Sequence, residues 1–190
     1  KILEYPTEKN PLLVSVSEVL GDMQDPRLIT KMMMGMYHLQ GDFSKEALQE
    51  ADQIDRKGVI IDKGRRDYRE KNFFTIDGAD ARDFDDAICI EGNQDEWLVY
   101  VAISDVSHYI KPGSALDDEA YQRATSVYLP NSVLPMLPSI LSDKLCSLNP
   151  NVERLVKCCK IQLSKEGEVL SYSFDKAVIC SKKRLTYTEA

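Results

Sequence analysis

One short stretch of the sequence joins two apolar runs through a dense group of acids. Between positions 77 and 86 a single base, Arg82, stands among five aspartates: Asp77, Asp80, Asp83, Asp85 and Asp86. Apolar residues at 73–76 and 87–90 flank the stretch, so it connects two core-forming strands and is not a polar tail. Two unit charges about 4 Å apart repel by roughly 4 kcal/mol at an effective dielectric of about 20. A fold that brings these carboxylates together therefore needs a cation.

The residue types favour a divalent metal, because hard carboxylate oxygens suit magnesium, manganese or calcium. Gly78 permits a tight turn after Asp77, which would fold that residue back toward Asp83, Asp85 and Asp86. Adjacent Asp85 and Asp86 point to opposite faces of a regular strand, so a shared site requires a bend or two metals. Two metals about 3.5–4 Å apart are typical of phosphodiester hydrolysis by an activated water.

Other interpretations of the same residues compete with catalysis. A calcium loop of the EF-hand type fails, because the twelfth position counted from Asp77 is Ile88 and no register places glycine sixth. A solvated acidic surface loop stays open on composition and spacing alone. Asp105, Ser107 and His108 lie close in sequence, but nothing near them resembles a nucleophile elbow.

Two tyrosines are candidates for contact with a nucleic acid. Tyr128 precedes Leu129 and Pro130, and Tyr187 follows a basic run at 182–184. Aromatic rings beside basic residues stack on the bases of a single strand, each worth roughly 1–3 kcal/mol. The residues alone favour the alternative, in which both tyrosines belong to the core.

The hydrophobic periodicity predicts an α/β chain of the α+β type with a mostly antiparallel, strand-rich second part. Strands are expected at 10–20, 73–77, 86–91, 97–104, 155–164 and 168–180, with a turn at 165–168 between the last two. Helices are expected over 26–39, 44–54 and 117–125. Asp25 should cap the first helix, with Pro26 as its first residue, Ser44 should start the second, and Asp117 should cap the third. A proline-rich irregular loop is expected at 128–150, and a charged connector at 56–71.

Composition limits the class of protein. Of the 190 residues, 43% are hydrophobic and 29% charged, which is typical of a soluble globular protein, and no apolar run approaches the roughly 20 residues of a membrane helix. Five cysteines without a CxxC pair indicate reduced thiols and a cytoplasmic location. The net charge of −7 argues against nonspecific affinity of the whole chain for nucleic acid.

The acidic stretch resembles the signature of the RNB catalytic domain in the ribonuclease II/ribonuclease R family. Its sequence, Gly78-Ala79-Asp80-Ala81-Arg82-Asp83-Phe84-Asp85-Asp86, is closer to that of ribonuclease R than to that of ribonuclease II. The resemblance covers most of 67–190 and continues in six further segments, at 101–107, 125–130, 135–138, 141–142, 145–150 and 184–187.

The resemblance implies a hydrolase, namely a processive 3′→5′ exoribonuclease that degrades single-stranded RNA to nucleoside 5′-monophosphates. The resemblance also implies that the enzyme uses one or two Mg²⁺ ions, for which Mn²⁺ can substitute. On this basis Asp77, Asp83 and Asp86 chiefly hold metal, and Asp85, also a ligand, is the residue most directly needed for cleavage. Tyr128 would stack on the RNA near its 3′ end, and Tyr187 would contact the terminal nucleotide. Asp80 has no assigned role.

The resemblance also implies a domain order. Residues 1–22 would end a cold-shock-like OB-fold β-barrel, 23–66 would form a helical linker, and 67–190 would be the amino-terminal part of a longer RNB domain. We therefore expect a piece of an enzyme that is inactive by itself, monomeric at full length, and without membrane or DNA partners. A rival from another class is a catalytically silent RNA- or protein-binding member; all four aspartates are present, which disfavours it.

Overall fold

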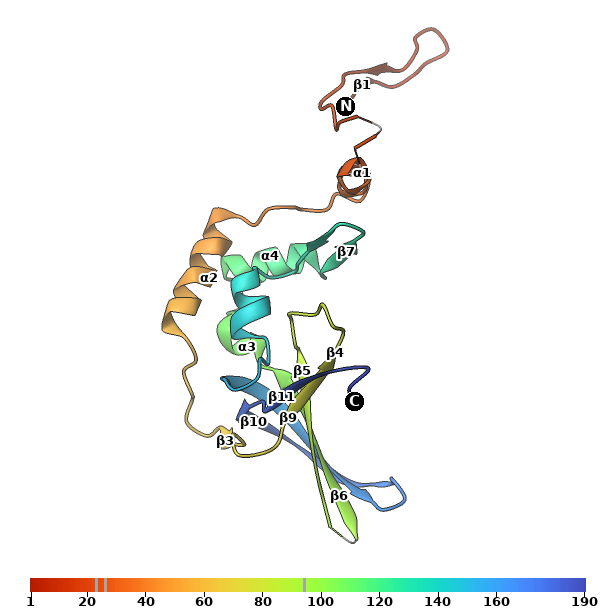
Figure 1. Ribbon diagram of the computed structural model, residues 1–190. Helices are drawn as coiled ribbons and strands as arrows, with labels where there is room; N and C mark the ends of the chain where they lie inside the picture. Colours follow the sequence, from red (N-terminus) through yellow and green to blue (C-terminus); the bar gives the residue numbers. More distant parts are fainter. Residues whose placement is uncertain (23, 26, 94) are drawn as a thin grey trace. The chain divides into compact units, whose positions relative to one another are not determined.

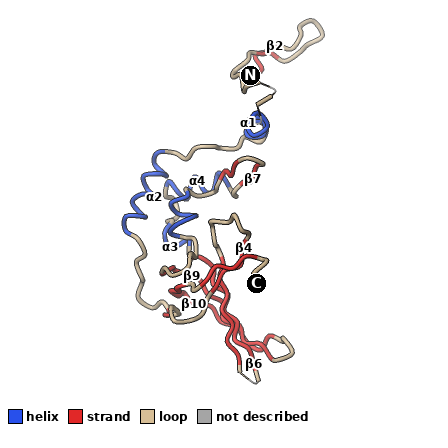
Figure 2. The backbone as a smooth tube through the Cα atoms, viewed as in Figure 1, coloured by secondary structure: helices blue, strands red, loops and turns tan. Residues whose placement is uncertain are grey.

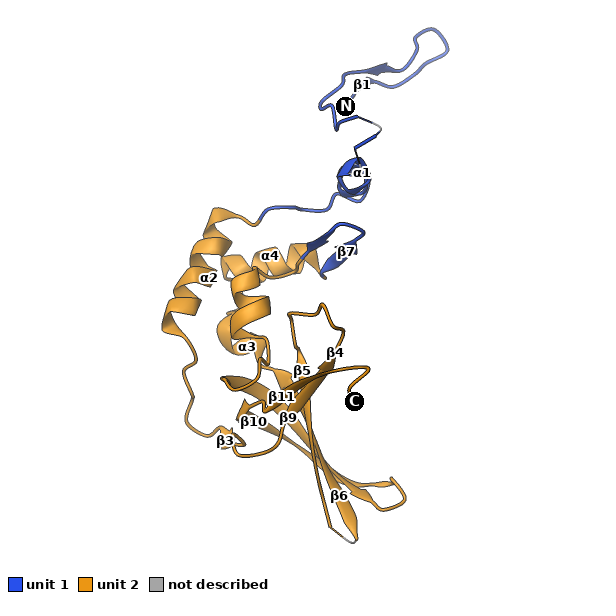
Figure 3. Cartoon of the chain, viewed as in Figure 1, with its two compact units in different colours: residues 1–42, 126–134 blue, residues 43–125, 135–190 orange. Residues whose placement is uncertain are grey.

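The computed structural model describes all residues except 23, 26 and 94. The chain divides into two compact units, one formed by residues 1–42 and 126–134 and the other by 43–125 and 135–190 (Figure 3). The larger one contains the acidic stretch.

The smaller unit is built from short elements (Figure 2). Strands β1 (Ile2–Glu4) and β2 (Leu13–Val14) pair antiparallel, helix α1 spans Arg27–Met36, and β7 (Val127–Leu129) pairs with β8 (Ser132–Leu134). The strand expected over 10–20 is wrong except for the two residues of β2. Strand β2 pairs with β1 at only two positions, and its side chains are exposed. Whether 1–22 belongs to an OB-fold barrel stays a prediction.

Helix α1 begins as expected but ends early. The Asp25 carboxylate accepts the amide N–H of Arg27 at 2.9 Å, which is the predicted capping contact. The expected proline at position 26 lies outside the described residues. The helix ends at Met36 instead of 39, where His38 adopts a φ of 52° and interrupts the helical backbone.

A seven-stranded sheet dominates the larger unit, in the order β11-β4-β5-β6-β9-β10-β3 (Figure 1). The inner pairs are antiparallel, and the outer pairs β11–β4 and β10–β3 are parallel. The strands are β3 (Arg66–Asp67), β4 (Phe74–Asp77), β5 (Asp86–Gly92), β6 (Glu96–Ser104), β9 (Glu153–Ser164), β10 (Val169–Cys180) and β11 (Lys183–Thr186). The predicted mixed α/β fold is confirmed.

Five of these strands match the predicted ranges closely: β4, β5, β6, β9 and β10. In β10 three consecutive residues, 177–179, are buried, but burial alternates along β5 and β6. In β6, for example, Tyr100 and Ala102 are buried while Trp97 and Ile103 are exposed. The connector at 56–71 differs from the expectation: helix α2 extends into it, and β3 within it joins the sheet through Ala177 and Val178 of β10. Such a two-residue strand carries no periodicity to predict.

Helices α2 (Lys45–Lys57), α3 (Val106–Tyr109), α4 (Ala115–Arg123) and the π-helix η1 (Ile140–Leu145) gather at one end of the sheet (Figure 1). Their apolar side chains pack on Leu155 of β9 and Val178 of β10. A second core on the sheet includes Phe73, Phe84 and Leu148. The second core therefore reaches Phe84 in the middle of the acidic stretch.

The helix caps were predicted in part. Ser44 precedes α2 and its Oγ accepts the Ala47 N–H, as expected, but the helix runs to Lys57. The assignment of Asp117 as the cap of α4 is wrong: Ser114 is the cap, and its Oγ accepts the N–H of Asp117 at 3.3 Å. The loop expected at 128–150 contains β8, η1 and most of β7.

Candidate active site

The acidic stretch forms the connection from β4 to β5 (Figure 1). Asp77 is the last residue of β4 and Asp86 the first of β5, so both are fixed by the sheet, while Asp80, Asp83 and Asp85 lie in the connection. We call residues 78–85 the acidic loop. Gly78 adopts no positive φ, and a Cβ there would contact nothing within 4 Å. The turn therefore does not depend on glycine, contrary to the expectation.

Buried hydrogen bonds hold the middle of the acidic loop. The Phe84 N–H donates to Ser147 Oγ at 3.0 Å, and that hydroxyl donates to the Arg82 carbonyl at 2.9 Å. The Leu148 N–H donates to the Phe84 carbonyl at 2.8 Å, and the Phe84 ring is buried in the second core. Since Asp83 and Asp85 flank Phe84, these contacts set the backbone from which both carboxylates project.

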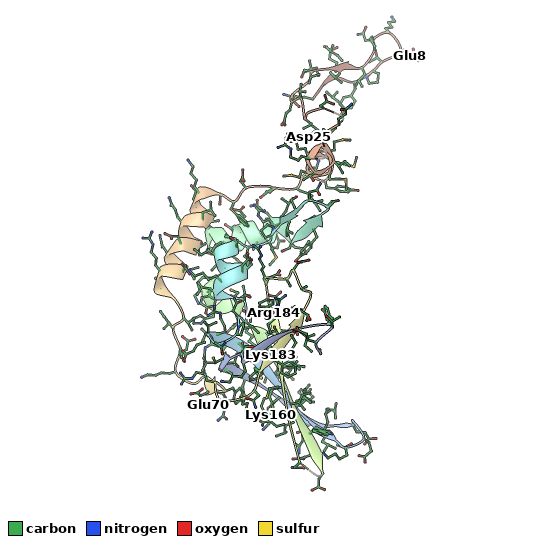
Figure 4. The ribbon with its side chains drawn as sticks, in the orientation of Figure 1. Glu8, Asp25, Glu70, Lys160, Lys183 and Arg184 are labelled. Atoms are coloured by element: carbon green, nitrogen blue, oxygen red, sulfur yellow. The ribbon has the colours of Figure 1, made fainter. Side chains whose placement is uncertain are left out.

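Contacts from β6 and β11 hold the two ends of the loop. The Ser104 N–H at the end of β6 donates to the Asp85 carbonyl at 2.9 Å. Arg184 of β11 donates from Nη2 to the carbonyls of Gly78 and Ala79 at 2.6 and 2.7 Å. Figure 4 labels Arg184 beside this loop. The acidic loop is therefore tied to three separate parts of the larger unit.

The carboxylates of the site repel one another. Burial raises the pKa of Asp77, and repulsion by Asp86 and Asp83 adds to this effect, while the Thr75 hydroxyl and the charge of Arg184 oppose it. Desolvation of its carboxyl raises the pKa of Asp85 although the residue as a whole is exposed, and repulsion by Asp83, Asp86 and Asp77 adds further. Positive charge placed among these groups would offset the repulsion.

One oxygen atom gives a direct test of whether the site fits a cation. Asp77 Oδ2 is buried and has no hydrogen-bond partner among the residues that the structure describes. A buried carboxylate oxygen without a partner is costly, so such an atom needs an explanation. Coordination of a hard divalent cation would satisfy it, and the neighbouring aspartates supply further ligands of the same kind. The donor chemistry of the residues present thus fits a metal.

The four aspartates nevertheless form no closed ligand set. Outside positions 23, 26 and 94, no three His, Cys, Asp or Glu side chains lie close enough together to hold an ion. The strand register separates two of the four. Phe74 of β4 pairs with Ile88 of β5, so Asp86 shares the face of Ile88, whereas Asp77, three residues after Phe74, belongs to the other face. The carboxylates approach the ends of the strands from two sides.

The two candidate tyrosines are exposed, so the alternative of core tyrosines is wrong for both. Tyr187 is 76% exposed and follows Thr186, which pairs with Asp77 across β11 and β4. Tyr128 is 68% exposed and lies in β7 of the smaller unit. The register thus brings Tyr187 next to the acidic site.

A hydrogen-bonded network, and not a catalytic triad, contains Asp105, Ser107 and His108. This agrees with the absence of a nucleophile elbow from the sequence. Asp105 accepts hydrogen bonds from Arg65 Nη2 at 2.7 Å and from Ser107 Oγ at 3.1 Å. His108 Nδ1 lies 3.1 Å from Asp62 Oδ2 and 3.2 Å from Arg65 Nη2. Arg65 thus lies between Asp105 and His108, and the Ser107 hydroxyl donates to the Asp105 carboxylate instead of to a histidine.

Sequence reasoning missed two residues that shape the acidic loop, Ser147 and Arg184. Each lies within a segment that carries the resemblance, 145–150 and 184–187, but spacing gave neither one a role. Their function depends on contacts with a loop far away in sequence.

Comparison with known proteins agrees with these features. The sequence profile of the RNB domain matches residues 65–190. The chain is 42% identical over 193 aligned positions to ribonuclease R of Buchnera aphidicola subsp. Acyrthosiphon pisum, covering 100% of this chain and 26% of that protein. The chain thus spans about a quarter of that relative's length.

Solved structures share the fold. Mycoplasma genitalium RNase R in complex with ribose-methylated single-stranded RNA is 34% identical, with a TM-score of 0.89 over 99% of this chain and 30% of that one. Yeast Ssd1, a pseudonuclease, has a TM-score of 0.75 at 17% identity, covering 100% of this chain and 24% of that one, which is a likeness of fold alone. In the described part of the chain, each helix is too short or too polar to cross a bilayer.

Proposed function

The chain belongs to the RNB-domain family, and from this premise we propose that it carries the metal-binding part of a 3′→5′ exoribonuclease. The substrate is single-stranded RNA, degraded processively from its 3′ end to nucleoside 5′-monophosphates. The single observation that carries the proposal is the acidic site itself. It keeps all four aspartates and includes a buried carboxylate oxygen that lacks a hydrogen-bond partner among the described residues.

We assign the residues of the site by their positions. Asp77, Asp83 and Asp86 chiefly hold the metal, and Asp85 is the ligand most directly needed for cleavage. The cation is Mg²⁺, with Mn²⁺ able to replace it, because oxygen ligands suit both. When bound, one or two such ions supply positive charge to the attacking and leaving oxygens of an in-line displacement. In the reaction a water oxygen bonds to phosphorus as the bond to the 3′ oxygen breaks.

The tyrosines complete the proposed RNA contact. An exposed ring next to the acidic site, as at Tyr187, can pack against the terminal nucleotide, and the exposed ring of Tyr128, in the smaller unit, can stack on another base of the RNA. Stacking suits a substrate without fixed sequence, since every base offers a flat face.

The proposal concerns the full-length protein, given that the chain spans 26% of the relative's length. We propose that residues 1–22 end an OB-fold domain, that 23–66 link it to the RNB domain, and that 67–190 begin the latter. We further propose a monomer located in the cytoplasm, with no DNA or membrane partner.

The experiment is a degradation assay. With Mg²⁺ present, the full-length protein should shorten a 5′-labelled single-stranded RNA stepwise from its 3′ end and release nucleoside 5′-monophosphates. Because the carboxylates need a cation, removal of the metal with EDTA should stop the reaction, and added Mg²⁺ or Mn²⁺ should restore it. Internal cleavage products, or unchanged decay in EDTA, would contradict the proposal.

The alternative is a catalytically silent member that binds RNA. Such a protein has no need to keep four carboxylates that repel one another in a partly buried place. It would retain RNA in a binding assay and leave it intact with either cation.

A further inference from the structure

Arg184 ties the edge strand β11 to the first turn of the acidic loop. The parallel register places Arg184 opposite Thr75, two residues before Asp77. From there one nitrogen, Nη2, donates to the carbonyls of Gly78 and Ala79, the first two after Asp77. The Gly78 carbonyl also accepts the Ala81 N–H at 3.1 Å, which closes the turn. The arginine therefore holds the backbone at the point where the chain leaves β4.

The same guanidinium reaches the centre of the loop. Its carbon lies 5.1 Å from the centre of the Phe84 ring, and Phe84 stands between Asp83 and Asp85. A planar guanidinium can stack on a ring while its N–H groups bind carbonyls, and a lysine ammonium cannot do both in this geometry. One side chain thus contacts both the first turn of the acidic loop and the Phe84 ring, which stands between two of the carboxylates.

The position of Arg184 leaves one of its own N–H groups buried without a hydrogen bond to any described residue, which lowers stability. Arg184 Nε is buried and finds no hydrogen-bond partner within the described part of the chain. Natural proteins rarely leave such a donor unsatisfied, and the exceptions call for an explanation. A role in shaping the neighbouring site supplies one.

We propose that Arg184 is a positioning residue, which holds the acidic loop in the shape that presents its aspartates to the divalent cation. The inference rests on the proposed function. Arg184 need not touch metal or RNA; it acts through the backbone of Gly78 and Ala79 and through the ring of Phe84. Groups that orient metal ligands typically contribute about 10- to 100-fold to metal affinity.

The test compares three variants of the full-length protein. Arg184→Met removes the charge and the donors, Arg184→Lys keeps the charge without the planar fork, and Lys183→Met is the matched control. Lys183 is the exposed neighbour on β11, pairs with Phe74, and contacts no part of the loop in the hydrogen bonds or ring contacts described above. Mg²⁺ affinity is measured by calorimetry, and hydrogen exchange is measured over 78–86.

Arg184→Met should bind Mg²⁺ about 10-fold more weakly and exchange faster over 78–86. Arg184→Lys should show most of this loss, and Lys183→Met none of it. Wild-type affinity and wild-type exchange in both Arg184 variants would overturn the inference and leave the proposed function standing. If Arg184→Met does not fold, Arg184→Lys decides alone. Absence of Mg²⁺ binding by the wild type would overturn the proposed function, and the inference with it.

Discussion

Asp85→Asn is expected to slow degradation of a 3′-single-stranded RNA by the full-length protein about 100-fold or more. Changes to groups that only orient a metal ligand already cost about 10- to 100-fold, and loss of a ligand's charge should cost at least as much. The substitution keeps the shape of the side chain and removes its negative charge. The Asp85 backbone should stay in place, because its carbonyl accepts the Ser104 N–H.

The matched control is Asp80→Asn, which makes the same chemical change within the same loop. Asp80 is exposed and stands outside the four proposed ligands. Initial rates should be compared at saturating Mg²⁺ and RNA, with circular dichroism to verify folding. If Asp85→Asn degrades RNA as fast as the wild type, or if Asp80→Asn is impaired equally, the assigned role of Asp85 is wrong.

Asp105→Asn is expected to lower the free energy of unfolding by about 3–5 kcal/mol, since removal of one partner of a buried ion pair leaves the other charge uncompensated. The side chains of Arg65 and Asp105 are 1% and 2% exposed and meet at 2.7 Å. Asp62→Asn is the matched control: Asp62 also contacts Arg65, at 3.3 Å, but is 47% exposed. That exposed contact should contribute no more than about 1 kcal/mol.

The same pair predicts a dependence on pH. Burial raises the pKa of Asp105, but the hydrogen bonds from Arg65 and Ser107 outweigh it, so the pKa lies below its ordinary value. The stabilisation is therefore complete above the unfolded pKa of about 3.9 and is lost as pH falls through the lower folded value. Urea unfolding from pH 7 to about pH 3 should show this loss in the wild type. An equal loss in Asp105→Asn would contradict the assignment.

Strand positions could be predicted from the sequence because apolar and β-branched residues occur there in short runs bounded by turn residues. The pairs β5–β6 and β9–β10 are long and antiparallel. Buried and exposed residues alternate along β5 and β6, and β9 and β10 flank the predicted turn at 165–168. Strand β3 and the hairpin β7–β8 are too short to show a period. The π-helix η1 follows Pro138, and the proline-rich composition of its surroundings predicted a loop instead.

The acidic site could be predicted only as a set of residues. Asp77, Asp83, Asp85 and Asp86 were evident from their density between two strands and from the resemblance. Their geometry was not, because it depends on the register between Phe74 and Ile88 and on contacts from distant segments. Ser147 and Arg184 approach the loop from positions 65 and more than 100 residues away in the chain, and no local pattern encodes such contacts.

The most direct test of the proposed metal site is a Mg²⁺ titration of the full-length protein by calorimetry, comparing wild type with Asp77→Asn. Asp77 Oδ2 is a buried carboxylate oxygen for which the described residues supply no partner, so its replacement removes the ligand best placed for a cation. We predict that wild type binds Mg²⁺, that Asp80→Asn binds it equally, and that Asp77→Asn binds it at least about 10-fold more weakly. Equal affinity in Asp77→Asn and wild type would contradict the metal site.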